Sequence, residues 1–360
     1  MNDSIPPDPE HVSPETDPVT PETEASSIYD EPAQPEVAAE EAQPESAASG
    51  VVARMRAQIE RSVLGQQEVI SQVLAALLAG GHVLLEGKPG LGKTQLVLAM
   101  AKSFAGDFSR IQFTPDLMPS DVTGFRLFDM KSQTFQLRQG PVFTNLLLAD
   151  EINRAPAKTQ SALLEVMQER QVTIDGETMP LSAPFMTLAT QNPIEHEGTY
   201  PLPEAQLDRF LMKVLLDYPD GTSETEIVTR SASEIPGASP VDSVEVVATP
   251  EEVVAAQAET AAVQVVPEVV DYAVAIVQAT REAKSIALGA GTRGAISLVR
   301  IGKAIAILHG RNFVTPDDIK AASLPVLRHR VQVAPEVSIG GQTVDEILRG
   351  LVESVPAPRH

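Results

Sequence analysis

The apolar positions of the chain change their spacing along its length. From Val51 to Gly81 they recur every three or four residues, which predicts two amphipathic helices separated by a break at Gly65. Short and almost wholly apolar runs follow, as is typical of strands buried on both faces. These runs are 82–87, 110–113, 146–150, 185–190 and 210–217. Helical patterns lie between some of them, so we expect an α/β fold with a parallel sheet flanked by helices.

Two segments interrupt this alternation with the two-residue period of an exposed hairpin. The first is 127–140, and the second is 171–181, which carries an Asp175-Gly176 turn. After Pro219 the chain becomes acidic, and from 267 the helical period returns. We therefore expect an α/β core at 51–218 and a smaller, mostly helical domain at 219–360.

The first 50 residues differ in composition from the rest of the chain. Residues 1–50 carry −13 of the net charge of −22, and the remainder of the chain carries −9. Residues 1–50 also hold 9 of the 29 prolines. Such a segment cannot bury enough apolar surface to offset its chain entropy, so we expect a disordered acidic tail. The composition fits a tail that only keeps the chain solvated and equally one that acts as an interaction arm.

The composition also excludes several kinds of protein. The chain has no cysteine, so it has neither disulfides nor a cysteine-ligated metal site. It shows no signal peptide and no apolar run of about 20 residues, which predicts a cytoplasmic protein without a membrane span. The acidic balance argues against a nucleic-acid partner. His82, His196, His309 and His329 lack metal-ligand spacing and are expected to be packing or surface residues.

The segment 87–94, Gly-Lys-Pro-Gly-Leu-Gly-Lys-Thr, fits the phosphate-binding pattern G-x-x-x-x-G-K-[ST] and lies between a predicted strand and a predicted helix. Its glycines let the backbone wrap a phosphate chain, and the helix N-terminus attracts negative charge. Lys93 would reach the β- and γ-phosphates of a nucleotide, and Thr94 would ligate Mg²⁺. The candidate nucleotide-binding residues here are Gly87, Pro89, Gly90, Gly92, Lys93, Thr94 and Gln95.

Two adjacent acids, Asp150 and Glu151, end the predicted strand at 146–150. A buried carboxylate is costly unless a partner compensates its charge. Mg²⁺ bound with a nucleotide is such a partner, and Asp150 would hold it through water together with Thr94. Glu151 would then polarise the attacking water as a general base.

Three further residues are candidates for the same chemistry. Asn192 follows the next strand and would orient the attacking water, although an asparagine before proline is by itself a common turn residue. Arg209 would serve as an arginine finger, in its own subunit or a neighbouring one. Its alternative is a surface arginine paired with Asp208. Arg293 opens a helix, where a positive charge is disfavoured unless a phosphate lies nearby or the residue is paired elsewhere.

Residues 87–94, 146–176 and 189–210 resemble the MoxR family of AAA+ ATPases, and the likeness extends from Val51 to the C-terminus. The resemblance implies an ATPase that uses ATP and Mg²⁺ and has a helical lid domain. It implies the following roles: Walker A at 87–94, Walker B at Asp150 and Glu151, sensor 1 at Asn192, the arginine finger at Arg209, sensor 2 at Arg293, the adenine side at Gly65, and a contact of Arg154 with a neighbouring subunit. The family's Gly-Ala-Ser-Pro-Arg before sensor 2 is Gly-Ala-Gly-Thr-Arg here, so the helix entry lacks its proline.

The resemblance also implies partners. Members form homo-oligomers, with a hexameric ring as the expectation, and couple ATP hydrolysis to chaperone-like remodelling, assembly or metal insertion of a partner protein. That partner is often a von Willebrand factor A-domain protein. Three alternatives remain from the sequence: a nucleic-acid-dependent motor, a magnesium-chelatase-like ATPase subunit, and a scaffold that binds nucleotide without hydrolysing it.

Overall fold

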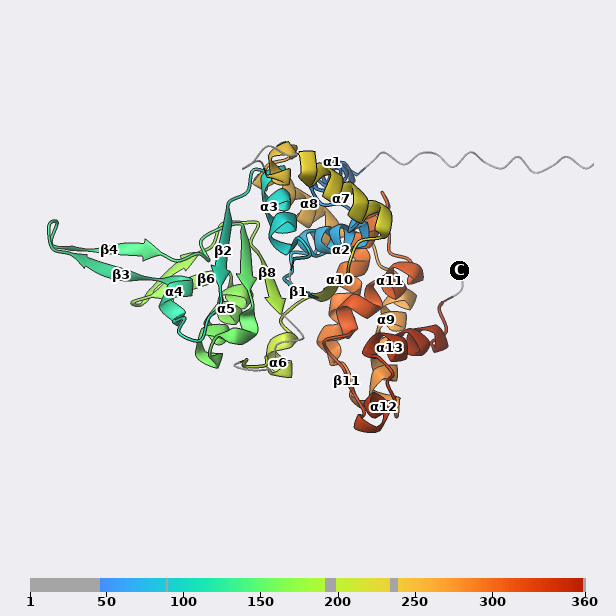
Figure 1. Cartoon of the computed structure of the whole chain (residues 1–360). Coiled ribbons are helices and arrows are strands. Elements are labelled where there is room, and N and C mark those ends of the chain that lie inside the picture. The colour runs from blue at the N-terminus through green and yellow to red at the C-terminus, as the bar shows by residue number, and fades with distance from the viewer. Residues whose placement is uncertain (1–45, 89, 192–198, 234–238, 359–360) are drawn as a thin grey trace, which may run out of the picture. The chain divides into compact units, whose positions relative to one another are not determined.

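The computed structural model describes residues 46–88, 90–191, 199–233 and 239–358 (Figure 1). The predicted acidic tail lies outside these residues except for its last few. Helix α1 (Ala47–Ser62) begins where the Ser46 side chain accepts a hydrogen bond from the Ser49 amide. It starts four residues before the boundary that composition predicts, because Ala48 is already buried in the core.

Five strands form one sheet in the order β2-β5-β8-β1-β9. Their bounds are β1 Val83–Gly87, β2 Phe108–Gln112, β5 Leu146–Asp150, β8 Met186–Gln191 and β9 Met212–Leu216. All four neighbouring pairs are parallel. The predicted α/β fold is therefore confirmed, and each of the five apolar runs overlaps one strand of the sheet.

Both faces of the sheet are covered, because successive side chains along a strand point to opposite sides. On β1, Leu85 belongs to the apolar cluster built with α1, α2 and α3, whereas Leu84 belongs to the cluster built with α5. These helices are α2 Gln67–Leu78, α3 Lys93–Ser103 and α5 Ala157–Glu169. Burial on both faces explains why inner strands such as β1 and β5 are largely apolar runs rather than alternating ones.

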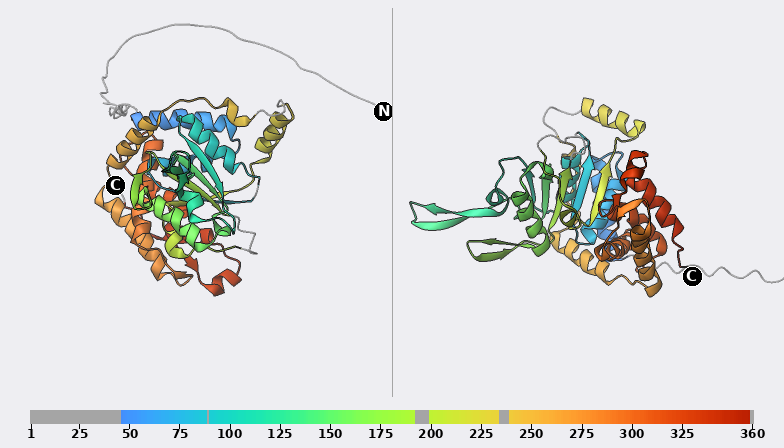
Figure 2. Two further views of the ribbon diagram at one scale, coloured as in Figure 1. Left: turned by 90° about the vertical axis from the view of Figure 1, so that its left-hand side faces the viewer. Right: turned by 90° about the horizontal axis from the view of Figure 1, so that it is seen from below.

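Two antiparallel hairpins project from the sheet (Figures 1 and 2). They are β3 Gly124–Asp129 with β4 Thr134–Gln139, and β6 Gln171–Ile174 with β7 Glu177–Pro180. Both coincide with the segments whose two-residue alternation predicts hairpins, although the first begins at Gly124. An ion pair between Arg126 and Glu177 joins them.

Beyond β9 the described residues are mostly helical, in agreement with the predicted helical lid. The elements are α7 Gly221–Ser233, η2 Pro240–Ser243, α8 Pro250–Ala262, α9 Pro267–Glu282, β10 Ile286–Leu288, α10 Thr292–Leu308, α11 Pro316–Leu327, β11 Gln332–Val333, α12 Pro335–Ile339 and α13 Val344–Ser354. Three short helices lie in the core: α4 Pro119–Thr123, η1 Ile152–Arg154 and α6 Glu204–Leu207. Within the described part of the chain, no helix has the length and apolar character needed to cross a membrane.

His82 precedes β1 directly and ties this strand to two neighbours. Its Nε2 donates to the Met167 carbonyl at 2.9 Å, and its Nδ1 accepts from the Thr187 amide at 2.9 Å. Both bonds fit a neutral ring, and burial lowers the pKa of His82 to about 4. The predicted packing role holds for His82, and among the described residues no group of three or more metal-ligating side chains could hold an ion. His196 lies outside the described residues.

We expect the free energy of unfolding to fall between pH 7 and pH 5, partly through His82. The unfolded chain takes up a proton at this residue near its ordinary pKa of 6.5, whereas the folded chain does so only near 4. This contribution is full above pH 6.5 and is lost as the pH falls towards 4, by about 2 kcal/mol at pH 5. Urea denaturation of His82→Gln at both pH values should show a correspondingly weaker pH dependence, and a dependence equal to wild type would contradict the assignment.

Candidate nucleotide-binding site

The loop between β1 and α3 has the backbone freedom that a phosphate cradle requires. Gly90 and Gly92 adopt φ angles of 83° and 76°, and a Cβ at either position would face open space. Gly87 meets a different constraint, since a Cβ there would lie 2.7 Å from the Leu216 carbonyl oxygen. No side chain caps the first turn of α3 at Gly92. Its amides are therefore available to an anion.

An open pocket of about 360 Å³ lies over this loop and the ends of neighbouring strands. It brings together most of the residues predicted from the sequence and four that were not. The lining residues are Gly87, Gly90, Leu91, Gly92, Lys93, Thr94, Gln95, Arg110, Gln112, Asp150, Glu151 and Thr190. Pro89 and Asn192 lie outside the described residues, so their predicted roles stay predictions.

Lys93 points its ammonium group back along the loop, where Nζ donates to the Gly87 carbonyl at 2.5 Å. Burial lowers the pKa of Lys93, and the carboxylates of Asp150, Glu86 and Glu151 oppose that shift. A phosphate would offer the ammonium group a charged acceptor in place of a neutral one.

Asp150 ends β5 with both carboxylate oxygens engaged. Thr190 donates to Oδ1 at 3.0 Å, and Arg110 on β2 forms an ion pair with Oδ2 at 2.7 Å. Thr190 also accepts a hydrogen bond from the Glu151 amide at 2.9 Å, so one hydroxyl holds both acids in place. Arg110 was not among the residues predicted from the sequence, although it is the charged first residue of the run at 110–113 and lies within β2.

Glu151 has a positive φ of 55°, which costs a non-glycine residue about 1 kcal/mol. This turn separates its side chain from that of Asp150. Its Oε2 accepts from Gln112 at 2.7 Å and from Arg154 at 2.9 Å. Arg154, for which the resemblance implies a contact with another subunit, thus contacts Glu151 of its own chain.

The donor set fits a magnesium ion. The Thr94 hydroxyl and the Asp150 carboxylate are hard oxygen donors of the kind that Mg²⁺ takes. Mg²⁺ in phosphate-binding sites keeps several waters and uses one or two carboxylates plus substrate phosphates. A protein cage of three or more ligating acids is therefore not required here.

A second and larger pocket, of about 960 Å³, adjoins the first and shares Gly90, Leu91, Gly92 and Gln95 with it. Its walls include Leu64, Gln66, Tyr218, Pro219, Ile227 and Val228. Gly65 sits in the turn between α1 and α2 with φ 71°, and a Cβ there would lie 2.6 Å from Pro219 Cβ. The turn therefore closes against the segment after β9 and lines an apolar recess that suits a nucleobase.

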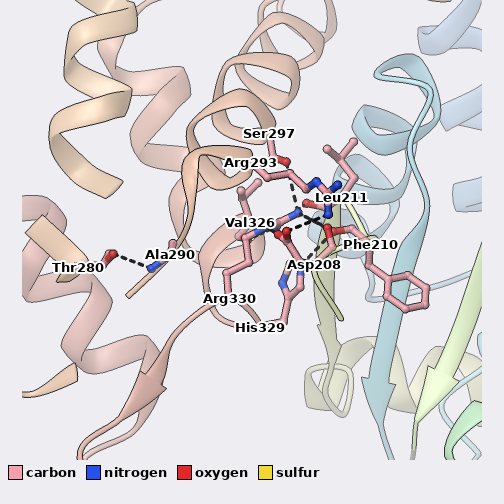
Figure 3. Close-up of polar contacts among 10 residues, drawn as sticks. All are labelled: Asp208, Phe210, Leu211, Thr280, Ala290, Arg293, Ser297, Val326, His329 and Arg330. Carbon is pink, nitrogen blue, oxygen red and sulfur yellow. Dashed lines mark hydrogen bonds and ion pairs between the residues drawn. The ribbon is translucent and has the colours of Figure 1, made fainter. Parts of the chain in front are cut away.

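Arg209 and Arg293 line neither of these pockets. Both border a third one, of about 320 Å³, together with Arg170, Arg300 and Arg330. The alternative pairing of Arg209 with Asp208 is not seen, because Asp208 pairs with Arg293 at 3.1 Å and with Arg330 at 2.8 Å (Figure 3). The side chain of Arg209 is exposed and has no hydrogen bond or ion pair to the described part of the chain.

Comparison with known proteins identifies two regions of the chain. Residues 82–212 match the ATPase family associated with various cellular activities, and residues 278–351 match the AAA lid domain. A protein called YeaC from Bacillus subtilis is 46% identical over 300 residues, covering 83% of this chain and 92% of that protein. Chaperone MoxR1 from Mycobacterium tuberculosis is 41% identical over 321 residues, covering 84% and 83%. The crystal structure of a Cytophaga hutchinsonii protein superposes with a TM-score of 0.80 at 41% identity, covering 87% of this chain and 96% of that one.

We expect Lys93→Ala to weaken ATP binding by at least about tenfold, because it removes the ammonium group that would pair with the phosphates. Isothermal titration calorimetry measures the affinity directly. Lys131→Ala, the same change on the exposed β3–β4 hairpin, is the matched control and should bind ATP like wild type. Equal affinities for the two variants would rule out the role of Lys93.

Proposed function

The chain belongs to the MoxR family of AAA+ ATPases, and on that premise we propose that it couples ATP hydrolysis in an oligomeric ring to chaperone-like remodelling of a partner protein. One observation supports the proposal above the others: the P-loop glycines, Lys93, Thr94, Asp150 and Glu151 line a single pocket. A complete set of this kind argues against a scaffold that binds nucleotide without turning it over. The name of the relative Chaperone MoxR1 supports the chaperone-like part.

In the proposed reaction the loop amides and Lys93 bind the phosphate chain, and the recess beside Gly65 takes the base. Thr94 and Asp150 would hold Mg²⁺, which neutralises charge on the phosphates when bound. Glu151 accepts the proton of the attacking water. Gln112 and Arg154 both donate to its Oε2, which holds the carboxylate in position. Asn192, which follows β8, would orient the same water.

We expect Glu151→Gln to bind ATP with wild-type affinity and to hydrolyse it at least about 100-fold more slowly, since an amide cannot accept the proton. Binding by calorimetry and phosphate release under saturating ATP separate the two effects. Glu282→Gln, an exposed glutamate at the end of α9, is the control for the loss of a charge. Phosphate release at the wild-type rate would exclude Glu151 as the base.

Arg209 is proposed to act on ATP bound by the next subunit. It lies outside both pockets beside its own P-loop, and its side chain is exposed and without a partner among the described residues. Arg293 borders the same third pocket, so we propose that it too faces the neighbouring subunit rather than the nucleotide of its own chain. A ring supplies such a neighbour to every site, and six subunits are the expectation from the family.

Mixed rings test this arrangement. We expect Arg209→Ala rings and Lys93→Ala rings each to lose ATP turnover, by about 1000-fold for the arginine finger. Mixing the two variants should restore part of the activity, because some intact P-loops then face an intact Arg209. Arg349→Ala, on the exposed side of α13, serves as the control. Mixtures that stay as inactive as their components would argue against a finger supplied by a neighbour.

The partner is proposed to be a protein rather than a nucleic acid. The β3–β4 hairpin exposes Phe125, Leu127, Phe128, Met130, Phe135 and Leu137. Its cations are few, and one of them, Arg126, is paired with Glu177. Apolar side chains of this kind suit a protein surface better than a phosphate backbone. A partner with a von Willebrand factor A domain, and a role in assembly or metal insertion, come to this chain from the family resemblance.

A further inference from the structure

The lid binds the chain segment that follows Arg209 through hydrogen bonds to its backbone. Three consecutive residues after α11, Arg328, His329 and Arg330, each donate to backbone carbonyls at the start of β9. Arg328 reaches the Lys213 carbonyl at 3.3 Å, His329 reaches that of Phe210 at 3.0 Å, and Arg330 reaches those of Phe210 at 2.7 Å and Leu211 at 3.1 Å. The residues that follow Arg209 in the chain are thus fixed by the lid of the same subunit.

Arg330 is the centre of this contact. Its side chain is 2% exposed, and a buried guanidinium is tolerated only when its charge and its donors are satisfied. Nε donates to Asp208 Oδ1 at 2.8 Å, Nη1 donates to the carbonyls of Leu211 and Val326, and Nη2 donates to the carbonyl of Phe210 and to Ser297 Oγ. All five N–H donors therefore have acceptors, and the guanidinium has one available position.

Asp208 links Arg330 to Arg293. Its Oδ1 accepts from Arg330, and its Oδ2 accepts from Arg293 Nη1 at 3.1 Å (Figure 3). Arg293 stands at the start of α10, where a positive charge is disfavoured, and the carboxylate removes that conflict. The same Asp208 side chain is 31% exposed, so it lies at the edge of the third pocket, where Arg209 and Arg293 reach the surface.

The approach to Arg293 is fixed as well. The Ala290 amide donates to Thr280 Oγ1 at 2.9 Å, and the Ala290 carbonyl accepts from Arg281 Nε at 2.8 Å. Figure 3 shows the first of these bonds beside the Asp208 cluster. These two hydrogen bonds to Ala290 hold the turn before Arg293. The family's proline, which this chain lacks, would otherwise stiffen that turn.

The backbone and the side chain of Arg209 differ in how firmly the structure holds them. Its backbone lies between Asp208, whose side chain is bonded on both oxygens, and Phe210, whose carbonyl accepts from two lid residues. Its own side chain is exposed and unpaired among the described residues. The backbone of Arg209 is therefore held by the lid, whereas its side chain can extend away from the subunit.

We propose that Asp208 and Arg330 are positioning residues, which lock Arg209 and Arg293 to the lid of their own subunit so that lid movement sets both arginines against the next subunit's nucleotide. The inference rests on the proposed function, because it assumes that Arg209 acts on a neighbour. Stability alone gives a weaker account of the cluster, since a buried ion pair is often no more stabilising than apolar residues of the same volume.

The first test is Asp208→Asn, which keeps an acceptor for Arg330 and removes the charge that holds Arg293. We expect ATP turnover to fall by about tenfold or more, as a displaced reacting group does, while ATP affinity stays within about twofold of wild type. The P-loop pocket contains neither Asp208 nor Arg330, which is why binding should survive. Phosphate release and calorimetry report the two quantities, and a fall in affinity as large as the fall in turnover would overturn the proposal.

Asp345→Asn is the matched control. It makes the same chemical change to the partner of Arg328, which belongs to the same tripeptide as Arg330. The Arg328–Asp345 ion pair, however, lies within the lid and touches no residue from 208 to 211. The Asp345 side chain is 26% exposed, close to that of Asp208. Turnover should remain within about twofold of wild type, because neither arginine is displaced. A loss equal to that of Asp208→Asn would show that general loosening of the lid is enough, and the proposal would fail.

Two further measurements separate positioning from a merely structural role. Mixing Asp208→Asn subunits with Lys93→Ala subunits should restore turnover, since the Lys93→Ala subunit still presents a correctly placed Arg209. The double variant Asp208→Asn/Arg209→Ala should be no slower than Arg209→Ala alone, because the two act as one unit. Absence of rescue, or additive losses, would refute the proposal. If Asp208→Asn melts below wild type, Ser297→Ala, which removes one acceptor of Arg330 and no charge, should show a smaller loss with the same rescue.

The outcomes also distinguish this inference from the proposed function. If Arg209→Ala leaves turnover unchanged, the finger itself is wrong. If Arg209→Ala abolishes turnover and Asp208→Asn does not alter it, the finger stands and only the positioning role is refuted.

Discussion

The pairing of β1 with β8 on one side and β9 on the other is the constraint on which the rest of the molecule depends. Parallel strands end at the same edge of a sheet, so the P-loop after β1 opens beside the end of β8. The register sets Gly87 opposite Leu216, and the Leu216 carbonyl leaves no room for a side chain there. Glycine at this position is therefore required by packing as well as by the phosphate. The adjacent end of β5 brings Asp150 to the same place.

Charge compensation is the second theme of the structure. The acids of the pocket have donors to their carboxylates: Arg110 and Thr190 for Asp150, and Gln112 and Arg154 for Glu151. In the Asp208 cluster the cations outnumber the acid, because one carboxylate lies between two arginines. Burial lowers the pKa of the neighbouring His329 well below its usual value, so this residue adds a donor and no further charge. The exposed Arg209 and Arg293 thus place positive charge on the surface of a protein that is acidic as a whole.

Much of this architecture could be predicted from the sequence, because it is encoded locally. Most strands of the sheet are apolar runs, and the two hairpins alternate. The P-loop and the two acids of β5 were found for the same reason. The pairing of Arg110 with Asp150 and the pairings of Asp208 with Arg293 and Arg330 were not found, since they depend on which strands are neighbours and where the lid docks. No short pattern contains that information. The start of α1 was missed because composition cannot show that Ala48 is buried.

The grip of the lid on the start of β9 has a further consequence for solubility. β9 is an edge strand, and edge strands carry unpaired backbone groups that can recruit a strand from another chain. Arg328 occupies the Lys213 carbonyl, and α11 packs against the same strand. A lid that stayed away from the core would leave this edge open to intermolecular sheet formation. The same residues that join the two parts of the subunit therefore also protect the sheet against aggregation.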